Sequence, residues 1–249
     1  MSLSICENLC PNKLNRVWKR ESMGNLESAI KYPFTEEGWG PKFILGGILN
    51  FIGAALGFIP YVGIFFWLLF SFFPLGYAYK VFRNHLEERE GPLPGWGGWG
   101  DLWRRGGYVF LIALGYGLVP AMLYWSGLNL WYEGGVASFV GVLFLILGVG
   151  MSLVAFFLWP MALASYASQG EFLAAAFQWK RIIEKIWLVQ SQYFSGWVAG
   201  IVLSFALLFL KTQIAYIGWI FYSFGFFYLS LSMAHLFGKI CREALKEEA

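Results

Sequence analysis

Residues that could carry out chemistry are few and widely separated in this sequence. The only histidines are His85 and His235, and the only aspartate is Asp101. No group of His, Cys and carboxylate residues has the spacing of a metal site, and the sequence contains no nucleophile-elbow, Walker-type or zinc-protease motif. The sequence therefore predicts a protein that is not an enzyme and holds no metal.

The two histidines are the remaining candidates for a binding role. Both fall near the charged ends of apolar segments, His85 after the second segment and His235 in the last. A histidine in this place could ligate a haem or a chlorophyll, or it could simply be solvated or hydrogen-bonded. No cofactor is predicted, and the pigment alternative stays open.

Composition indicates which solvent surrounds these residues. Hydrophobic residues make up 58% of the 249-residue chain and charged residues 13%, against about 45–50% and about 25% in soluble domains. A soluble globule of this size leaves roughly a quarter of its unfolded surface in water, which is too much for so apolar a chain. The sequence therefore predicts an integral membrane protein.

Long stretches without charge define six expected membrane-spanning helices. Each is long enough to cross the hydrocarbon core, and such runs are too long and too uniformly apolar for barrel strands. We expect an all-α protein with three sequential helical hairpins, an aromatic loop at 126–135, and a six-helix membrane domain at 42–238. The expected spans are about 42–59, 62–82, 107–126, 136–160, 193–210 and 216–237.

Positive charges predict the orientation of these spans. Of the 18 Lys and Arg residues, Lys42 directly follows the arm at 1–41. All the others but Lys211 fall in that arm, in the tail at 239–249, or in the segments 80–106 and 159–192, which an even number of spans places on the same side. The positive-inside rule makes that side cytoplasmic and predicts a prokaryotic inner or internal membrane with both termini inside. The small net charge of +3 argues against a nucleic-acid partner.

Residues 91–105 form the first of two segments that we expect at the membrane interface. Tryptophan rings favour the headgroup layer, and arginines there meet lipid phosphates. The segment is either an anchored loop that sets the angle between two hairpins or a site for lipid or a partner. The residues concerned are Trp96, Trp99, Trp103, Arg104 and Arg105.

Residues 171–189 form the second interfacial segment. The apolar residues can share one face of an in-plane amphipathic helix, with Lys180, Arg181 and Lys185 opposite. This helix is either a linker on the inner leaflet or a surface that recognises anionic lipid or a cytosolic partner.

Pairs of small residues predict close helix packing. Gly53 and Gly57 share one expected span, and Gly196 and Gly200 share another. This spacing lets helix backbones approach each other and is a candidate surface for self-association or for other membrane subunits. In the N-terminal arm, Cys6 with Cys10 is a weak metal or disulfide candidate, and the sequence leaves open a start at Met23 instead of Met1.

Short motifs along the chain resemble an uncharacterised prokaryotic family of polytopic membrane proteins, catalogued as a domain of unknown function. The motifs extend over about residues 26–240, and Gly97-Gly98 stands where the family tends to carry acidic residues. The resemblance implies six membrane helices and no known activity. The motifs are Lys31-Tyr32-Pro33-Phe34, Gly46-Gly47, Pro60-x-x-Gly63, Gly76-Tyr77, Lys80-x-x-Arg83 and Leu93-Pro94-x-Trp96-x-x-Trp99.

Three functions are compatible with these features. The first is a non-enzymatic membrane protein that organises lipid or serves as an accessory subunit of a membrane assembly. The second is a channel or carrier for small or hydrophobic solutes. The third is a cofactor- or pigment-binding subunit that uses His85 or His235. The expected spans contain almost no ionisable groups, which argues against catalysis and against proton-coupled transport.

Overall fold

Six long helices dominate the computed structural model, which describes residues 26–89 and 91–246. Every regular element in these residues is helical, and six helices are long and apolar enough to cross a membrane. The predicted class of a six-helix membrane protein is therefore confirmed. Cys6, Cys10 and Met23 lie outside the described residues. The long helices are α2 (Trp39–Leu56), α3 (Gly63–Leu86), α4 (Trp99–Glu133), α5 (Gly135–Ser168), α7 (Gln190–Gln213) and α8 (Ala215–Lys246).

Shorter elements include η2 (Tyr32–Phe34), η3 (Leu173–Phe177) and α6 (Trp179–Leu188). Consecutive long helices pack as pairs, α2 with α3, α4 with α5 and α7 with α8. α3 also packs against α4 and α8, and α2 against α8. The pairs are therefore interlocked around α3 and α8 and do not form a row of independent units.

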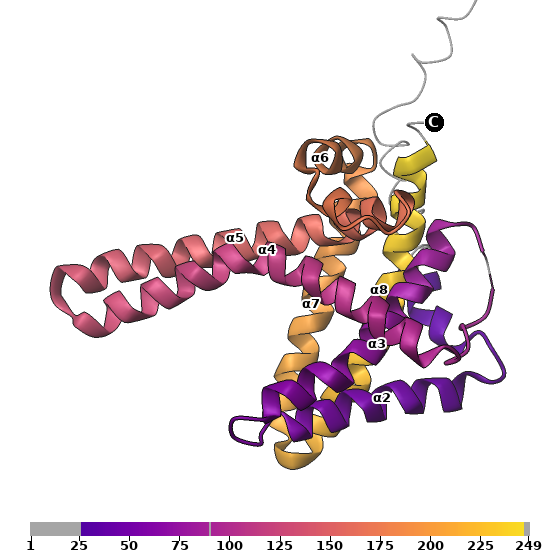
Figure 1. Ribbon diagram of the computed structural model, residues 1–249, viewed down its shortest axis with the longest axis horizontal. Coiled ribbons are helices and arrows are strands. Elements are labelled where there is room, and N and C mark those ends of the chain that lie inside the picture. The colour runs from indigo at the N-terminus through magenta and orange to yellow at the C-terminus, as the bar shows by residue number, and fades with distance from the viewer. Residues whose placement is uncertain (1–25, 90, 247–249) are drawn as a thin grey trace, which may run out of the picture.

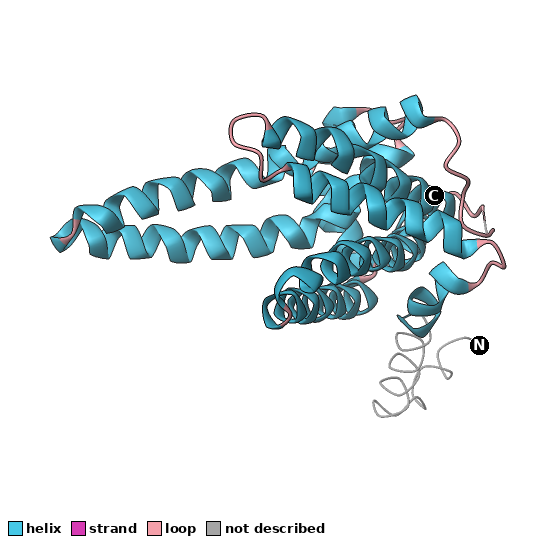
Figure 2. Cartoon of the chain, turned by 90° about the horizontal axis from the view of Figure 1, so that it is seen from below, coloured by secondary structure: helices cyan, strands magenta, loops and turns pink. Residues whose placement is uncertain are grey.

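The α4–α5 hairpin extends away from the rest of the molecule in both views (Figure 1, Figure 2). α4 has 35 residues, so its length is about 52 Å, against a hydrocarbon core of about 30 Å. A helix of this length must tilt strongly in the bilayer or reach beyond it. The outer part of the hairpin therefore offers its sides to lipid or to another protein.

Glycines allow α3 and α4 to cross at the base of this hairpin with their backbones in contact. A Cβ atom on Gly76 would lie 1.9 Å from the carbonyl oxygen of Leu102, and one on Gly106 would lie 1.9 Å from that of Phe72. No side chain fits at either position without moving a helix. This crossing fixes where the hairpin leaves the body.

The predicted loop at 126–135 is wrong. α4 continues to Glu133, and the chain reverses only at Gly134 and Gly135, whose φ angles are 77° and 60°. Two left-handed glycines suffice for the turn, so the aromatic residues before them remain helical. At the charged end, α4, α5 and α8 also extend past the predicted spans, because a helix need not stop where the membrane does.

The segment at 171–189 is not one amphipathic helix. Glu171 has a φ of 62° and Phe172 is extended, so the chain breaks after α5, forms the short 3-10 helix η3, and only then begins α6. The interfacial helix is therefore limited to the ten residues of α6, which lies at the same end of the molecule as the C-terminal part of α8 (Figure 1).

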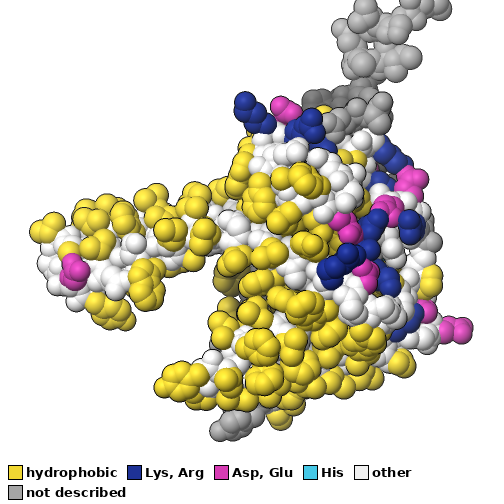
Figure 3. All heavy atoms as spheres, in the orientation of Figure 1, with side chains coloured by type: hydrophobic (Ala, Val, Ile, Leu, Met, Phe, Trp, Pro, Cys, Tyr) yellow, Lys and Arg dark blue, Asp and Glu magenta, His cyan; other side chains and the backbone are white. Residues whose placement is uncertain are grey.

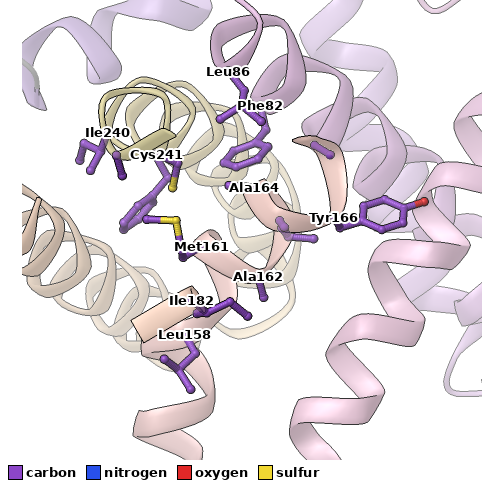
Figure 4. Packing of buried hydrophobic residues seen from close by; sticks show 14 of the residues in the cluster. Phe82, Leu86, Leu158, Met161, Ala162, Ala164, Tyr166, Ile182, Ile240 and Cys241 are labelled. Carbon is purple, nitrogen blue, oxygen red and sulfur yellow. The ribbon is translucent and has the colours of Figure 1, made fainter. Parts of the chain in front are cut away.

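The largest buried cluster lies where α5, α6 and α8 meet the end of α3 (Figure 4). α5 contributes a nearly continuous buried run from Leu158 to Ala167, although its outer half is mostly exposed. α5 is therefore anchored at one end and free at the other. Labelled members are Phe82, Leu86, Leu158, Met161, Ala162, Ala164, Tyr166, Ile182, Ile240 and the free cysteine Cys241.

Charged side chains gather at one end of the molecule, and apolar side chains cover the hairpin and the opposite part of the body (Figure 3). Lys211, the one basic residue predicted on the other side, lies 3.5 Å from the centre of the Trp219 ring. Such a cation–π contact stabilises an isolated charge near an apolar environment. The distribution is that of a protein embedded in a bilayer with one charged face.

Candidate functional site

The two histidines, 150 residues apart in the sequence, meet at the charged end of the molecule. His85 comes from the last turn of α3 and His235 from α8, and their side chains are 3% and 5% exposed. Gly238, one turn after His235, makes this possible because a Cβ there would lie 2.8 Å from His85 Cβ. The close approach of α3 and α8 therefore creates a buried histidine pair.

Hydrogen bonds assign the tautomers of this pair. His85 Nδ1 lies 2.8 Å from the carbonyl oxygen of Val81, which can only accept, so Nδ1 carries the proton and donates. In neutral His85, Nε2 is then an acceptor, and His235 Nδ1 donates to it over 2.9 Å. The remaining nitrogen, His235 Nε2, consequently presents a lone pair. It is buried and has no hydrogen-bond partner among residues 26–89 and 91–246.

Tyr32 packs against both imidazoles. Its ring centre lies 4.3 Å from that of His235, with the planes 27° apart, and 4.7 Å from that of His85, nearly perpendicular to it. Burial raises the pKa of Tyr32 to about 12, and the negative charge of Glu36 adds to the shift. Tyr32 therefore stays a neutral phenol in contact with the pair.

A cavity of about 290 Å³ adjoins the histidine pair. We call it the histidine cavity; it lies between η2, the loop after α3, and α8. This volume is at the lower end for ligand pockets, which measure about 300–1,000 Å³, so a small ligand fits better than a haem or a chlorophyll macrocycle. Its lining residues are Tyr32, Thr35, His85, Gly91, Pro92, His235 and Lys239.

The sequence pattern predicts no binding role for Tyr32 or Lys239. Tyr32 belongs to a motif that indicates only the family resemblance, and Lys239 indicates only the orientation of the spans. One signal was available, since His235 and Lys239 are four residues apart and therefore share a helix face. The contact with His85 depends on the crossing of α3 and α8, which the sequence pattern does not predict.

The tryptophans of the 91–105 segment have different environments. Trp96 is only 9% exposed, stacks on Tyr77 with ring centres 4.3 Å apart, and donates its indole N–H to the carbonyl oxygen of Lys42 over 2.9 Å. Trp99 and Trp103 are 45% and 41% exposed. The loop is thus fixed to α2 and α3 by Trp96, while the other two tryptophans remain on the surface.

The two arginines of this segment are engaged with carboxylates of the same chain. Both Arg104 and Arg105 donate to Asp101, at 2.9 and 2.7 Å. Arg105 also pairs with Glu171 at 2.9 Å, and Glu171 accepts from Arg83 of α3 at 2.8 Å. The resulting cluster joins α3, α4 and the break after α5, and it leaves Arg104 as the more exposed of the two arginines.

The basic residues of α6 divide between two faces. Lys180 and Arg181 are exposed at the start of the helix, as the amphipathic pattern predicts. Lys185 is only 6% exposed and shares the buried face with Ile182 and Ile186. Its predicted place on the polar face is wrong, because positions 182, 185 and 186 fall on one side of a helix.

The candidate self-association glycines face helices of the same chain. A Cβ on Gly53 would lie 3.2 Å from a side chain of α3, and Cβ atoms on Gly196 and Gly200 would lie 3.2 and 3.3 Å from side chains of α8. Gly57, which follows the last residue of α2, is exposed, but a Cβ there would still lie 3.4 Å from the Cβ of Trp67 in α3. All four glycines therefore lie next to another helix of the same molecule.

A second cavity lies in the apolar part of the molecule, at the base of the α4–α5 hairpin. We call it the α5/α7 crevice; it measures about 360 Å³ and has a floor of α3 and α8. Trp159 and Leu163 line one side, Trp197 and Ser204 the other. Ser204 donates to a carbonyl oxygen of its own helix, whereas the Trp197 indole N–H is buried and has no partner in the part of the chain that the structure describes.

These features define an α-helical polytopic membrane protein with a small polar cavity at its charged end and an apolar crevice among its membrane helices. Residues 61–216 match a family described as protein of unknown function (DUF4013), and the chain belongs to this family. The match is narrower than the range of 26–240 over which the motifs resemble such a family. It includes His85 but neither Tyr32, His235 nor Lys239. No curated protein and no solved structure matches the chain.

Proposed function

We propose that this protein is a non-enzymatic membrane protein that organises lipid, with its charged end in the cytoplasm of a prokaryote. The observation that carries the proposal is the α5/α7 crevice, an apolar cavity that opens among membrane helices beside the free α4–α5 hairpin. Water is not a stable occupant of an apolar cavity. The surrounding medium at this depth consists of acyl chains, which makes a lipid chain the natural occupant.

Trp197 favours a glycerolipid over a simple hydrocarbon. Its buried indole N–H lacks a partner, and an unpaired buried donor costs free energy. Trp197 lies seven residues after the start of α7, which is about 10 Å along the helix from the charged end. An ester carbonyl of a lipid lies near this depth and accepts hydrogen bonds. A single lipid would therefore fill the crevice with an acyl chain and accept a hydrogen bond from the indole N–H.

Native mass spectrometry of protein gently extracted from its own membrane tests the proposal. We expect co-purified glycerolipid on the wild-type protein and less of it on Ser204→Leu, because the larger side chain fills the crevice. Ser195→Leu is the matched control, since Ser195 is an exposed residue of the same helix. Trp197→Phe keeps an aromatic ring, removes the N–H donor, and is also expected to retain less lipid.

Other outcomes would favour the alternative functions. A protein free of lipid that carries a second membrane protein in fixed stoichiometry would indicate an accessory subunit that docks through the α4–α5 hairpin. Lipid binding that is equal in wild-type, Ser204→Leu and Ser195→Leu protein would refute the role of the crevice. Solute flux into liposomes that Ser204→Leu blocks would instead indicate a carrier of hydrophobic molecules.

A further inference from the structure

The histidine cavity contains an unused hydrogen-bond acceptor. The relay from His235 Nδ1 through His85 to the carbonyl oxygen of Val81 fixes the His235 ring and leaves the Nε2 lone pair without a donor. Leaving such a buried group unpaired costs free energy. The imidazole of His235 is therefore held in an orientation in which Nε2 can accept a hydrogen bond from a ligand.

Lys239 adds a positive charge to the same cavity. It lies one turn after His235 on α8 and is half-buried. Within residues 26–89 and 91–246, no carboxylate forms an ion pair with it. A ligand that pairs with both His235 Nε2 and Lys239 must therefore have a hydrogen-bond donor and a negative charge.

Few common anionic groups carry both a negative charge and a hydrogen-bond donor of their own at about pH 6. Carboxylic acids have already lost their proton at about pH 4, and a phosphodiester has no ionisable proton left. A phosphomonoester keeps one P–O–H group until about pH 6 and always carries a negative charge. We infer that the histidine cavity binds a phosphomonoester group, with its P–O–H donating to His235 Nε2 and its charge neutralised by Lys239.

The group could belong to a lipid or to free phosphate, because both present the same chemistry. Nε2 itself exposes less than 1 Å², so binding must include a small displacement of the cavity wall. The wall most suited to this is η2, a single 3-10 turn that carries Tyr32. The site is built from η2, α3 and α8, and it does not depend on the lipid proposed for the α5/α7 crevice.

Calorimetric titration of the full-length protein in detergent micelles tests the inference with three probes. These are short-chain phosphatidate, short-chain phosphatidylmethanol and inorganic phosphate. Phosphatidylmethanol is a phosphodiester with a negative charge, and its headgroup has neither a P–O–H nor any other hydrogen-bond donor. We expect phosphatidate to bind at least about tenfold more tightly, because one hydrogen bond involving a charged group is worth about this factor.

Substitutions identify the residues responsible. His235→Phe keeps the ring that stacks on Tyr32 and removes the acceptor, and Lys239→Met removes the charge; each should weaken phosphatidate binding at least about tenfold. Lys246→Met is the matched control, because it removes an equal charge from the same helix but from an exposed residue paired with Glu88. If His235→Phe fails to fold, the half-buried Lys239→Met still tests the site.

The affinities of the three probes and of the variants distinguish a soluble ligand from a lipid ligand and show whether the site exists. Binding of inorganic phosphate that depends on Lys239 supports the site with a soluble ligand, and binding of phosphatidate alone supports a lipid ligand. Equal affinities for phosphatidate and phosphatidylmethanol, or binding that Lys239→Met and Lys246→Met change alike, would overturn the inference. Loss of lipid from the Ser204→Leu variant with intact phosphatidate binding would show that the substitution alters the α5/α7 crevice and not the histidine cavity.

Discussion

Tyr193 bridges the turn of α5 that contains Pro160. In an uninterrupted helix the N–H of Met161 would donate to the carbonyl oxygen of Phe157, but a proline at position 160 disturbs this turn. The hydroxyl of Tyr193, from α7, lies between the two groups. It accepts from Met161 N over 3.2 Å and donates to Phe157 O over 2.6 Å. α7 thereby holds α5 where the free hairpin begins.

Tyr193→Phe removes this bridge and keeps the ring. Tyr193 is fully buried, and its ring contacts with Phe157 and Phe237 survive the change. Each lost hydrogen bond contributes about 0.5–1.5 kcal/mol, so two of them predict a loss of about 1–3 kcal/mol in the free energy of unfolding. For a chain of this size that corresponds to a decrease of about 2–12 °C in Tm.

Thermal unfolding of the detergent-solubilised protein measures this loss. Tyr132→Phe is the control, because that hydroxyl is on a side chain that is 84% exposed and its removal should leave Tm unchanged. Spin labels at Val149 on α5 and Phe205 on α7, both exposed, report the separation of the helices. We expect a broader distance distribution in Tyr193→Phe, because α7 no longer holds α5 at the turn that contains Pro160.

Combining Tyr193→Phe with Pro160→Ala tests whether the Tyr193 hydroxyl compensates for the proline. Alanine restores the N–H at position 160 and lets the helix close its own hydrogen bonds, so Tyr193→Phe should cost less in that background. A double-mutant cycle gives the coupling between the two residues. If Tyr193→Phe leaves Tm and the distance distribution as Tyr132→Phe does, or if the two substitutions are simply additive, the bridge does not hold α5.

Two further predictions concern the helix crossing and the histidine cavity. Gly106→Ala should destabilise the protein by about 3 kcal/mol or more, because the new Cβ would meet the Phe72 carbonyl oxygen. The control is Gly117→Ala, where the Cβ enters open space on the same helix; it should be neutral or stabilising by up to about 1 kcal/mol. Equal Tm values for the two variants would contradict this prediction. Tyr32 has its pKa raised from 10.0 to about 12, so its neutral form contributes stability that is complete below about pH 10 and lost as the pH rises through about 12. An ultraviolet difference titration of wild-type against Tyr32→Phe that shows phenolate formation near pH 10 would disprove this.

The helices could be predicted from the sequence because the membrane imposes a simple rule. Backbone groups in lipid must bond within a helix, so each long uncharged run predicts one helix whatever its neighbours are. The rule fixes the number and approximate position of the helices. It does not fix their ends, since Glu133 and Lys246 extend α4 and α8 into polar surroundings where no such rule applies.

The site could be predicted only in part, for the same physical reason. His85 and His235 were candidates by residue type, but their contact depends on Gly238 and on the crossing of α3 with α8. The α5/α7 crevice likewise depends on where the Tyr193 bridge joins α7 to the turn of α5 around Pro160. Contacts between helices that are distant in sequence arise from packing, and hydrophobic periodicity carries little information about them.

α8 forms a wall of both cavities. Met233, Ala234 and Phe237 line the α5/α7 crevice, whereas His235 and Lys239 line the histidine cavity. Because α8 packs closely against α3 at Gly238, we expect α8 to keep its position when either cavity is filled. Filling the crevice from α7 with Ser204→Leu should therefore leave phosphomonoester binding unchanged, and a change in that affinity would show that α8 moves as a unit between two positions.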